Sequence, residues 1–191
     1  MTAGRGEGAR ATEQRFRRLA ERWVAGREST HATAVALSAL PPSEWVVLHE
    51  PARPGRSRRG CDHLVVGPAG VVVIDSASCA GYDRDDPVMT TEGLPHPRVV
   101  RDVQASADAV SERVPGRVAA SVWPVLCVGW NLPRGITVGR TRVTSPAMLP
   151  LLLADLPPVL SAPHVVAVAH GLRQDLASRS TARAGRGRSA G

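Results

Sequence analysis

The distribution of apolar and polar positions divides the middle of the chain into short strands and helices. Five stretches rich in Val, Leu and Ile and bounded by Gly, Pro, Ser or Asp are typical of strands or a strand pair. These strand candidates are residues 44–50, 61–66, 71–75, 121–130 and 135–145. The continuous apolar character of several of them predicts strands that are buried on both faces.

Helical spacing of apolar residues occurs before, between and after these strand candidates. In the clearest case, apolar residues recur at intervals of three and four from Val99 to Val114. Two prolines stop the first helix, and serine–proline pairs predict the start of the last two. The helix candidates are residues 28–40, 99–114, 146–154 and 162–177, with a short amphipathic helix at 12–24.

The order of these elements predicts one mixed α/β domain with basic extensions at both ends. We place the domain at residues 23–177, after a partly helical N-terminal extension at 1–22. Residues 178–191 are rich in Arg, Gly, Ser and Ala, and they predict a disordered basic tail.

Charge supports this division. The chain has a formal net charge of +7, but residues 1–27 and 173–191 each carry +4, whereas residues 28–172 carry −1. All 24 basic residues are Arg, and the chain contains no Lys. No apolar run approaches the roughly 18 residues of a membrane span, and the N-terminus lacks a signal-peptide pattern, so we expect no membrane association and a cytoplasmic protein.

One arginine-rich segment lies inside the predicted domain. The stretch "RPGRSRRG" contains Arg53, Arg56, Arg58 and Arg59 shortly before Asp62. Arginine clusters of this kind bind the phosphate groups of DNA or RNA. A solvated loop without a ligand is the alternative interpretation, and the sequence favours neither.

The segment "CDHLVVGPAGVVVID" predicts an antiparallel hairpin with its turn at residues 67–70. Pairing Val66 with Val71 and continuing outward would bring Asp62 opposite Asp75. Cross-strand partners have Cβ atoms about 5 Å apart on the same face of the sheet. The two carboxylates are therefore expected side by side, unless a bulge shifts the register.

Two adjacent carboxylates repel one another unless a positive charge lies between them. Mg²⁺ supplies such a charge, and it is commonly held by one or two carboxylates together with substrate phosphate. Asp62 and Asp75 are therefore candidate metal ligands. In the alternative interpretation, each aspartate only ends a strand at the solvent edge.

The stretch from "EWVVLHE" through "CDHLVVGPAGVVVIDSASCAG" resembles the core of the nuclease-related domain (NERD) family, whose members are similar to PD-(D/E)XK nucleases. The likeness extends over most of residues 23–175 and is carried above all by the D-H-x-V-V-G-P-x-G-V run. It implies a restriction-endonuclease-like mixed central sheet flanked by helices. It also implies that Asp62 and Asp75 are catalytic metal ligands, and that Gln104 lies near the site.

The sequence departs from the family pattern at two of the four expected catalytic positions. The lysine expected two residues after Asp75 is replaced by Ala77. The glutamate expected in the first helix is replaced by Thr30, and Glu28 would point elsewhere on that helix. The resemblance therefore implies a degraded site.

Three functions remain compatible with the sequence. The favoured one is a nucleic-acid-binding or catalytically impaired nuclease-like module. The alternatives are an active Mg²⁺-dependent nuclease that uses Asp62 and Asp75, and a protein-interaction domain without a nucleic-acid role. Whether the chain is an enzyme stays open at this point, because fold alone does not establish activity.

Overall fold

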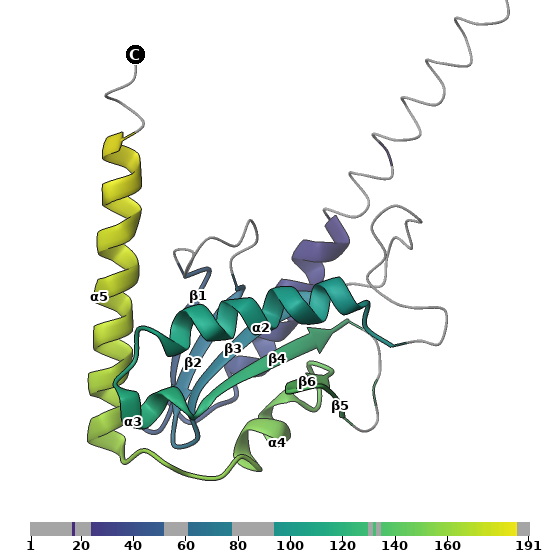
Figure 1. Ribbon diagram of the computed structural model, residues 1–191. Helices are drawn as coiled ribbons and strands as arrows, with labels where there is room; N and C mark the ends of the chain where they lie inside the picture. Colours follow the sequence, from purple (N-terminus) through teal and green to yellow (C-terminus); the bar gives the residue numbers. More distant parts are fainter. Residues whose placement is uncertain are drawn as a thin grey trace, which may run out of the picture.

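The structure, a computed structural model, describes residues 17, 24–51, 61–77, 94–129, 132 and 135–186, with side chains up to residue 176 (Figure 1). A helix covering residues 24–37 comes first. The elements that follow are β1 (Val46–His49), β2 (His63–Gly67), β3 (Gly70–Ala77), α2 (Pro97–Ser111), α3 (Gly116–Ala119), β4 (Val122–Val128), β5 (Ile136–Val138), β6 (Thr141–Thr144), α4 (Leu149–Ala154) and α5 (Ala162–Arg186).

The strands form one six-stranded mixed sheet in the order β1-β2-β3-β4-β6-β5. The central pairs β3–β4 and β4–β6 are parallel, and the outer pairs are antiparallel. The parallel connection from β3 to β4 runs through α2, because parallel neighbours need a crossover segment. The predicted mixed α/β fold, with a central sheet flanked by helices, is confirmed.

The β2–β3 hairpin has the predicted register. Its pairs run from His63 opposite Ile74 to Gly67 opposite Gly70, so Pro68 and Ala69 alone form the turn. Gly70 has a φ of 104°, which favours glycine, and an added Cβ would lie 2.3 Å from the carbonyl oxygen of Ser121. The turn therefore fixes both the register and the approach to the start of β4.

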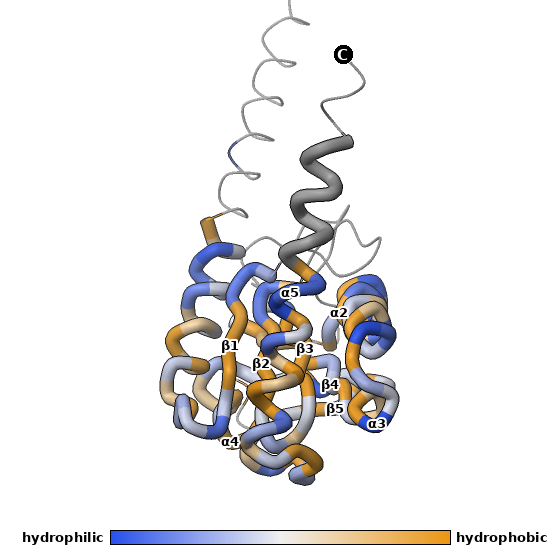
Figure 2. Tube along the Cα trace, turned by 90° about the vertical axis from the view of Figure 1, so that its left-hand side faces the viewer, coloured by the Kyte–Doolittle hydropathy of each residue, from blue (hydrophilic) through white to orange (hydrophobic). Residues whose placement is uncertain are grey.

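Helices cover both faces of the sheet. One core unites β2 and β3 with residues of α2, α3 and α5, and it includes Leu64, Val73, Val110 and Leu172. The opposite core joins the same strands to the helix 24–37 and to α4. Figure 2 shows the helix 24–37 and α2 on opposite sides of predominantly hydrophobic strands. Burial on both faces explains why the strand sequences are continuously apolar.

Pro124 lies inside β4 even though proline cannot donate to a sheet ladder. It pairs with Val73 of β3, whereas the pairing of β4 with β6 begins only at Val125. Pro124 therefore occupies a part of β4 that has a partner strand on one side only, which is where a sheet tolerates proline.

Four helices differ from their predicted limits, and the first of them covers residues 24–37 instead of 28–40. α2 begins at Pro97, where the His96 side chain caps the Arg98 N–H. α4 begins at Leu149 instead of 146, because Ser145 accepts a turn hydrogen bond from Met148 and the helix starts only after that turn. α5 continues to Arg186, beyond the predicted end at 177, and it extends past the body of the domain (Figure 1).

Two predicted features lie outside the described residues. They are the amphipathic helix at 12–24, of which only residues 17 and 24 are described, and the segment that contains Arg53, Arg56, Arg58 and Arg59. Among the helices that the structure describes, none is long and apolar enough to cross a membrane.

The contact between Gly67 and Trp45 gives a test of the packing. A Cβ at Gly67 would lie 2.0 Å from the Trp45 ring, which is itself buried. We expect Gly67→Ala to lower the free energy of unfolding by about 2 kcal/mol or more, because the indole must move within a filled core. Urea denaturation measures this. Gly116→Ala, which meets no atom within 4 Å, is the control and should change stability much less.

Candidate functional site

Asp62 lies just before β2, where regular pairing with β3 stops. Its N–H donates to the Ile74 carbonyl at 3.1 Å, although Ile74 is already the ladder partner of His63. Its own carbonyl accepts from the Glu50 N–H at 2.7 Å. The last predicted pair, Asp62 opposite Asp75, is therefore not formed, and a local bulge takes its place.

The bulge directs the Asp62 carboxylate into two hydrogen bonds. Oδ2 accepts from the Ser76 N–H at 2.7 Å and from the Thr30 hydroxyl at 3.2 Å. The first bond satisfies a backbone N–H of β3, and the second connects Asp62 to the helix 24–37. The Thr30 hydroxyl also donates to the Gly26 carbonyl oxygen at 3.1 Å, so its single proton is shared between the helix backbone and Asp62 Oδ2.

Further hydroxyl groups connect the same helix to the end of β3. Ser29 donates to the Ala77 carbonyl at 3.1 Å, and Ser76 donates to Thr33 at 3.0 Å. Thr33 in turn donates to the Ser29 carbonyl at 2.9 Å. Ser29 and Thr33 are buried, so these bonds satisfy groups that would otherwise be costly to bury. The helix position that bears Thr30 is therefore firmly defined.

Asp75 is half-buried on β3, opposite Leu126 of β4. Burial raises the pKa of the Cys61 thiol to about 12, and the charges of Asp75 and Asp62 add to this increase. The negative charges of both carboxylates therefore contribute to the raised pKa of the same buried thiol at this end of the sheet. Burial likewise raises the pKa of Cys127 to about 11, so both thiols stay protonated at neutral pH.

Two histidines meet beside Asp62. His49 and His63 are ladder partners, and their Nδ1 atoms lie 3.0 Å apart with the rings at 86°. His63 is buried, and within the described residues its Nε2 atom has no hydrogen-bond partner. Burial lowers the pKa of His63; the charge of Asp62 opposes this shift, and His49 reinforces it. His63 is therefore a packed residue and favours the neutral form.

The other predicted site residues have different positions. Ala77 is buried and packs with Val103 of α2, so its side chain meets apolar groups. Glu28 is exposed on the helix 24–37, away from the Thr30 contact. Gln104 is the eighth residue of α2, and its side-chain nitrogen would lie 3.2 Å from a Cβ at Gly139 in the β5–β6 turn. Gln104 is therefore in the middle of α2 and beside the β5–β6 turn.

In the sequence, the segment with Arg53, Arg56, Arg58 and Arg59 lies between Pro51 and Cys61. The structure describes Pro51 and Cys61 but not the arginines. Both flanking residues are at the end of the sheet that carries Asp62, because Glu50 is hydrogen-bonded to Asp62. Glu50 also has a φ of 44°, a left-handed conformation that turns the chain out of β1. The described residues on either side of the arginine segment therefore lie beside Asp62.

Asp62 and Asp75 are the metal ligands expected from the sequence. In the part of the chain that the structure describes, no group of three or more His, Cys, Asp or Glu side chains is arranged to hold a metal ion. Among the described side chains, Asp62 and Asp75 are the carboxylates that an ion at this end would meet, with water or substrate oxygens completing its coordination.

A comparison with protein families shows which family has this sequence pattern. The family model described as "Nuclease-related domain" matches residues 25–128, from the first helix to the last residue of β4. The chain belongs to the nuclease-related domain (NERD) family. This match covers the helix 24–37, β1–β4 and α2, and therefore every residue discussed at the candidate site. No curated protein and no solved structure matches the chain.

Sequence reasoning placed Thr30 at the NERD site but missed the hydroxyl network around it. A signal was present, because Ser29 and Thr33 are four residues apart and share a helix face with the buried side. Two of the partner groups on β3, however, are the Ser76 N–H and the Ala77 carbonyl of the backbone, which carry no side-chain signature. The network could therefore be recognised only from coordinates.

The lowered pKa of His63 predicts a loss of stability in acid. A histidine whose folded pKa lies below its unfolded value stabilises the fold above about pH 6.5 and loses that contribution as the pH falls. We expect His63→Leu to reduce the drop in unfolding free energy between pH 7.5 and 5.5, measured by urea denaturation. His170→Leu, at an exposed position of α5, should leave the drop unchanged. An equal drop in wild type and His63→Leu would contradict this assignment.

Proposed function

We propose that this NERD-family chain is a nucleic-acid-binding module whose nuclease-like site has lost most of its hydrolytic power. The hydrogen bond from the Thr30 hydroxyl to Asp62 Oδ2 is the observation that carries this proposal. At the helix position where the family resemblance implies a carboxylate, a neutral hydroxyl instead binds the remaining aspartate. The site therefore has one fewer anionic ligand for a cation.

The second support is the chemistry around Asp75. Cleavage of a phosphodiester requires positive charge near the phosphate, because negative charge develops on its oxygens in the transition state. Ala77 offers no charge, it lies against apolar neighbours, and the chain has no Lys that another element might supply. Loss of such an electrostatic group costs on the order of 10² in rate.

Mg²⁺ is the cation that fits the remaining donors, because Asp62 and Asp75 offer hard carboxylate oxygens. A bound Mg²⁺ would neutralise phosphate charge and activate water. Asp62 holds its carboxylate with Oδ2 fixed by Ser76 and Thr30, so its orientation does not depend on the ion. These residues fit a weak site of two carboxylates more closely than a full catalytic centre.

Nucleic-acid binding is assigned to Arg53, Arg56, Arg58 and Arg59. The residues that flank their segment, Pro51 and Cys61, adjoin Glu50 and Asp62, which are hydrogen-bonded to each other. A phosphate backbone bound by these guanidinium groups would thus pass close to the nuclease-like site. Contacts of this type bind DNA or RNA without reading the sequence, and they weaken as salt increases.

Salt-dependent binding tests this assignment. We expect Arg58→Ala/Arg59→Ala to weaken binding of a labelled DNA duplex and to reduce the slope of log K against log salt by about 1.8, if both residues contact phosphates. Fluorescence anisotropy measures both quantities. The control Arg117→Ala/Arg173→Ala removes the same charge from exposed positions elsewhere and should leave the slope nearly unchanged. Equal slopes for both double variants would contradict the proposal.

A plasmid-nicking assay with Mg²⁺ or Mn²⁺ tests the loss of catalysis. We expect wild-type nicking to be at least about 10²-fold slower than nicking by Thr30→Glu/Ala77→Lys, which restores the missing carboxylate and cation. Thr30→Gln/Ala77→Met matches the size of both side chains without their charges and should remain inactive. Rapid wild-type nicking that Asp62→Ala abolishes would instead show that the chain is an active nuclease.

A further inference from the structure

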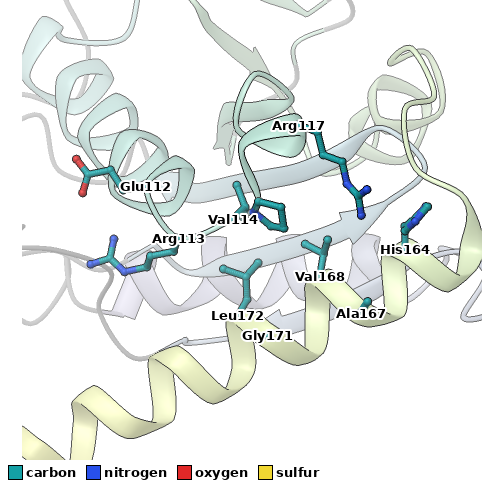
Figure 3. Close-up of a pocket in the computed structure, with 10 residues that line it drawn as sticks. Glu112, Arg113, Val114, Arg117, His164, Ala167, Val168, Gly171 and Leu172 are labelled. Atoms are coloured by element: carbon teal, nitrogen blue, oxygen red, sulfur yellow. The ribbon is translucent and has the colours of Figure 1, made fainter.

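A cavity of about 400 Å³ lies between the end of α2, α3 and α5 (Figure 3). Its walls include Val114 and Pro115, which follow α2 and lead toward the start of β4. Asp75 and Ala77 lie near the other end of β3, whose first residues pair with the start of β4. The cavity is therefore separate from the nuclease-like site, and its volume is within the range of about 300–1,000 Å³ typical of small-molecule sites.

The inner wall of the cavity is apolar and belongs to the main core. Val114, Val168 and Leu172 line it, and all three are buried. Gly171 lines it from α5, and an added Cβ there would meet no atom within 4 Å. A glycine inside a helix costs about 1 kcal/mol relative to alanine, and here no close contact requires it. Gly171 thus leaves open space above the apolar wall.

Two hydrogen-bond donors flank the opening. Figure 3 shows Arg117 of α3 and His164 of α5 on opposite walls, with their side chains extending toward the same gap. His164 Nδ1 lies 2.9 Å from the Ser161 hydroxyl. When that hydroxyl donates to Nδ1, the neutral imidazole carries its proton on Nε2 and is a donor there. A guanidinium and an imidazole N–H can together bind one oxyanion.

The other charged residues of the cavity, Arg113 and Glu112, do not face the gap between Arg117 and His164. Arg113 forms an ion pair with Asp175, with Nε 3.2 Å from Oδ2, and its guanidinium also donates to the Ala109 carbonyl. Glu112 points away from the gap between Arg117 and His164 in Figure 3. Among the charged residues that line the cavity, Arg117 thus has no ion-pair partner within the described part of the chain, and it lies next to the apolar wall.

We propose that this cavity binds a small organic carboxylate with an apolar chain. The carboxylate lies between Arg117 and His164, and the chain covers Val114, Val168 and Leu172 in the space left by Gly171. Charge complementarity selects the anionic head, and burial of the chain supplies the apolar part of the affinity. The inference is independent of nucleic-acid binding and of the residues around Asp62.

Octanoate is the probe for this site. Isothermal titration calorimetry of the full chain should show saturable binding with a Kd near or below about 1 mM. Arg117→Gln should weaken binding about tenfold or more, because it removes a charge-assisted hydrogen bond. Gly171→Leu should abolish binding by filling the cavity. Leucine has the better helix propensity, so this variant should fold.

Matched controls separate a specific site from general effects. Gly26→Leu places the same side chain at another helical glycine with open space, outside the cavity, and should bind octanoate as wild type does. Thermal unfolding verifies that each variant is folded. Octan-1-ol should bind more weakly than octanoate, and acetate more weakly still. The proposal is overturned if octanoate does not saturate, if octan-1-ol matches it, or if Gly171→Leu still binds.

Discussion

The Asp62 carboxylate connects β3 and the helix 24–37 at the point where β2 begins. Asp62 lies just before β2, accepts a hydrogen bond from the Ser76 N–H of β3, and accepts another from Thr30 on the helix 24–37. A carboxylate at the rim of a sheet can hold both bonds because its charge strengthens them. The position of the helix relative to the sheet, and hence the shape of the nuclease-like site, depends on this group.

This arrangement gives one residue a structural and a functional role that conflict. A carboxylate whose Oδ2 is used by Ser76 and Thr30 offers fewer lone pairs to a cation than a free one. The apolar surroundings of Ala77 add nothing positive. The hydrogen bonds from Ser76 and Thr30 therefore compete with a cation for the same oxygen atom, which supports the proposal that the NERD fold is retained while its hydrolytic power is reduced.

The sequence predicted the hairpin register well because two local constraints agree. Gly70 must adopt positive φ, and the apolar residues from Leu64 to Val73 must be buried in a sheet covered on both faces. The prediction failed one residue further, at Asp62. There the deciding contacts come from Thr30, 32 residues earlier in the chain, and from a backbone N–H.

The two edge strands of the sheet, β1 and β5, affect how readily the sheet could pair with a strand of another chain. β5 has three residues and β1 has four, so each outer strand offers only a brief row of backbone groups to a foreign strand. β1 also ends where Glu50 enters a left-handed conformation and the chain leaves the plane of the sheet. Short, interrupted margins disfavour the edge-to-edge stacking that leads to aggregation. The central strands are continuously aliphatic, but the short edge strands β1 and β5 thus disfavour fibril-like growth of the sheet.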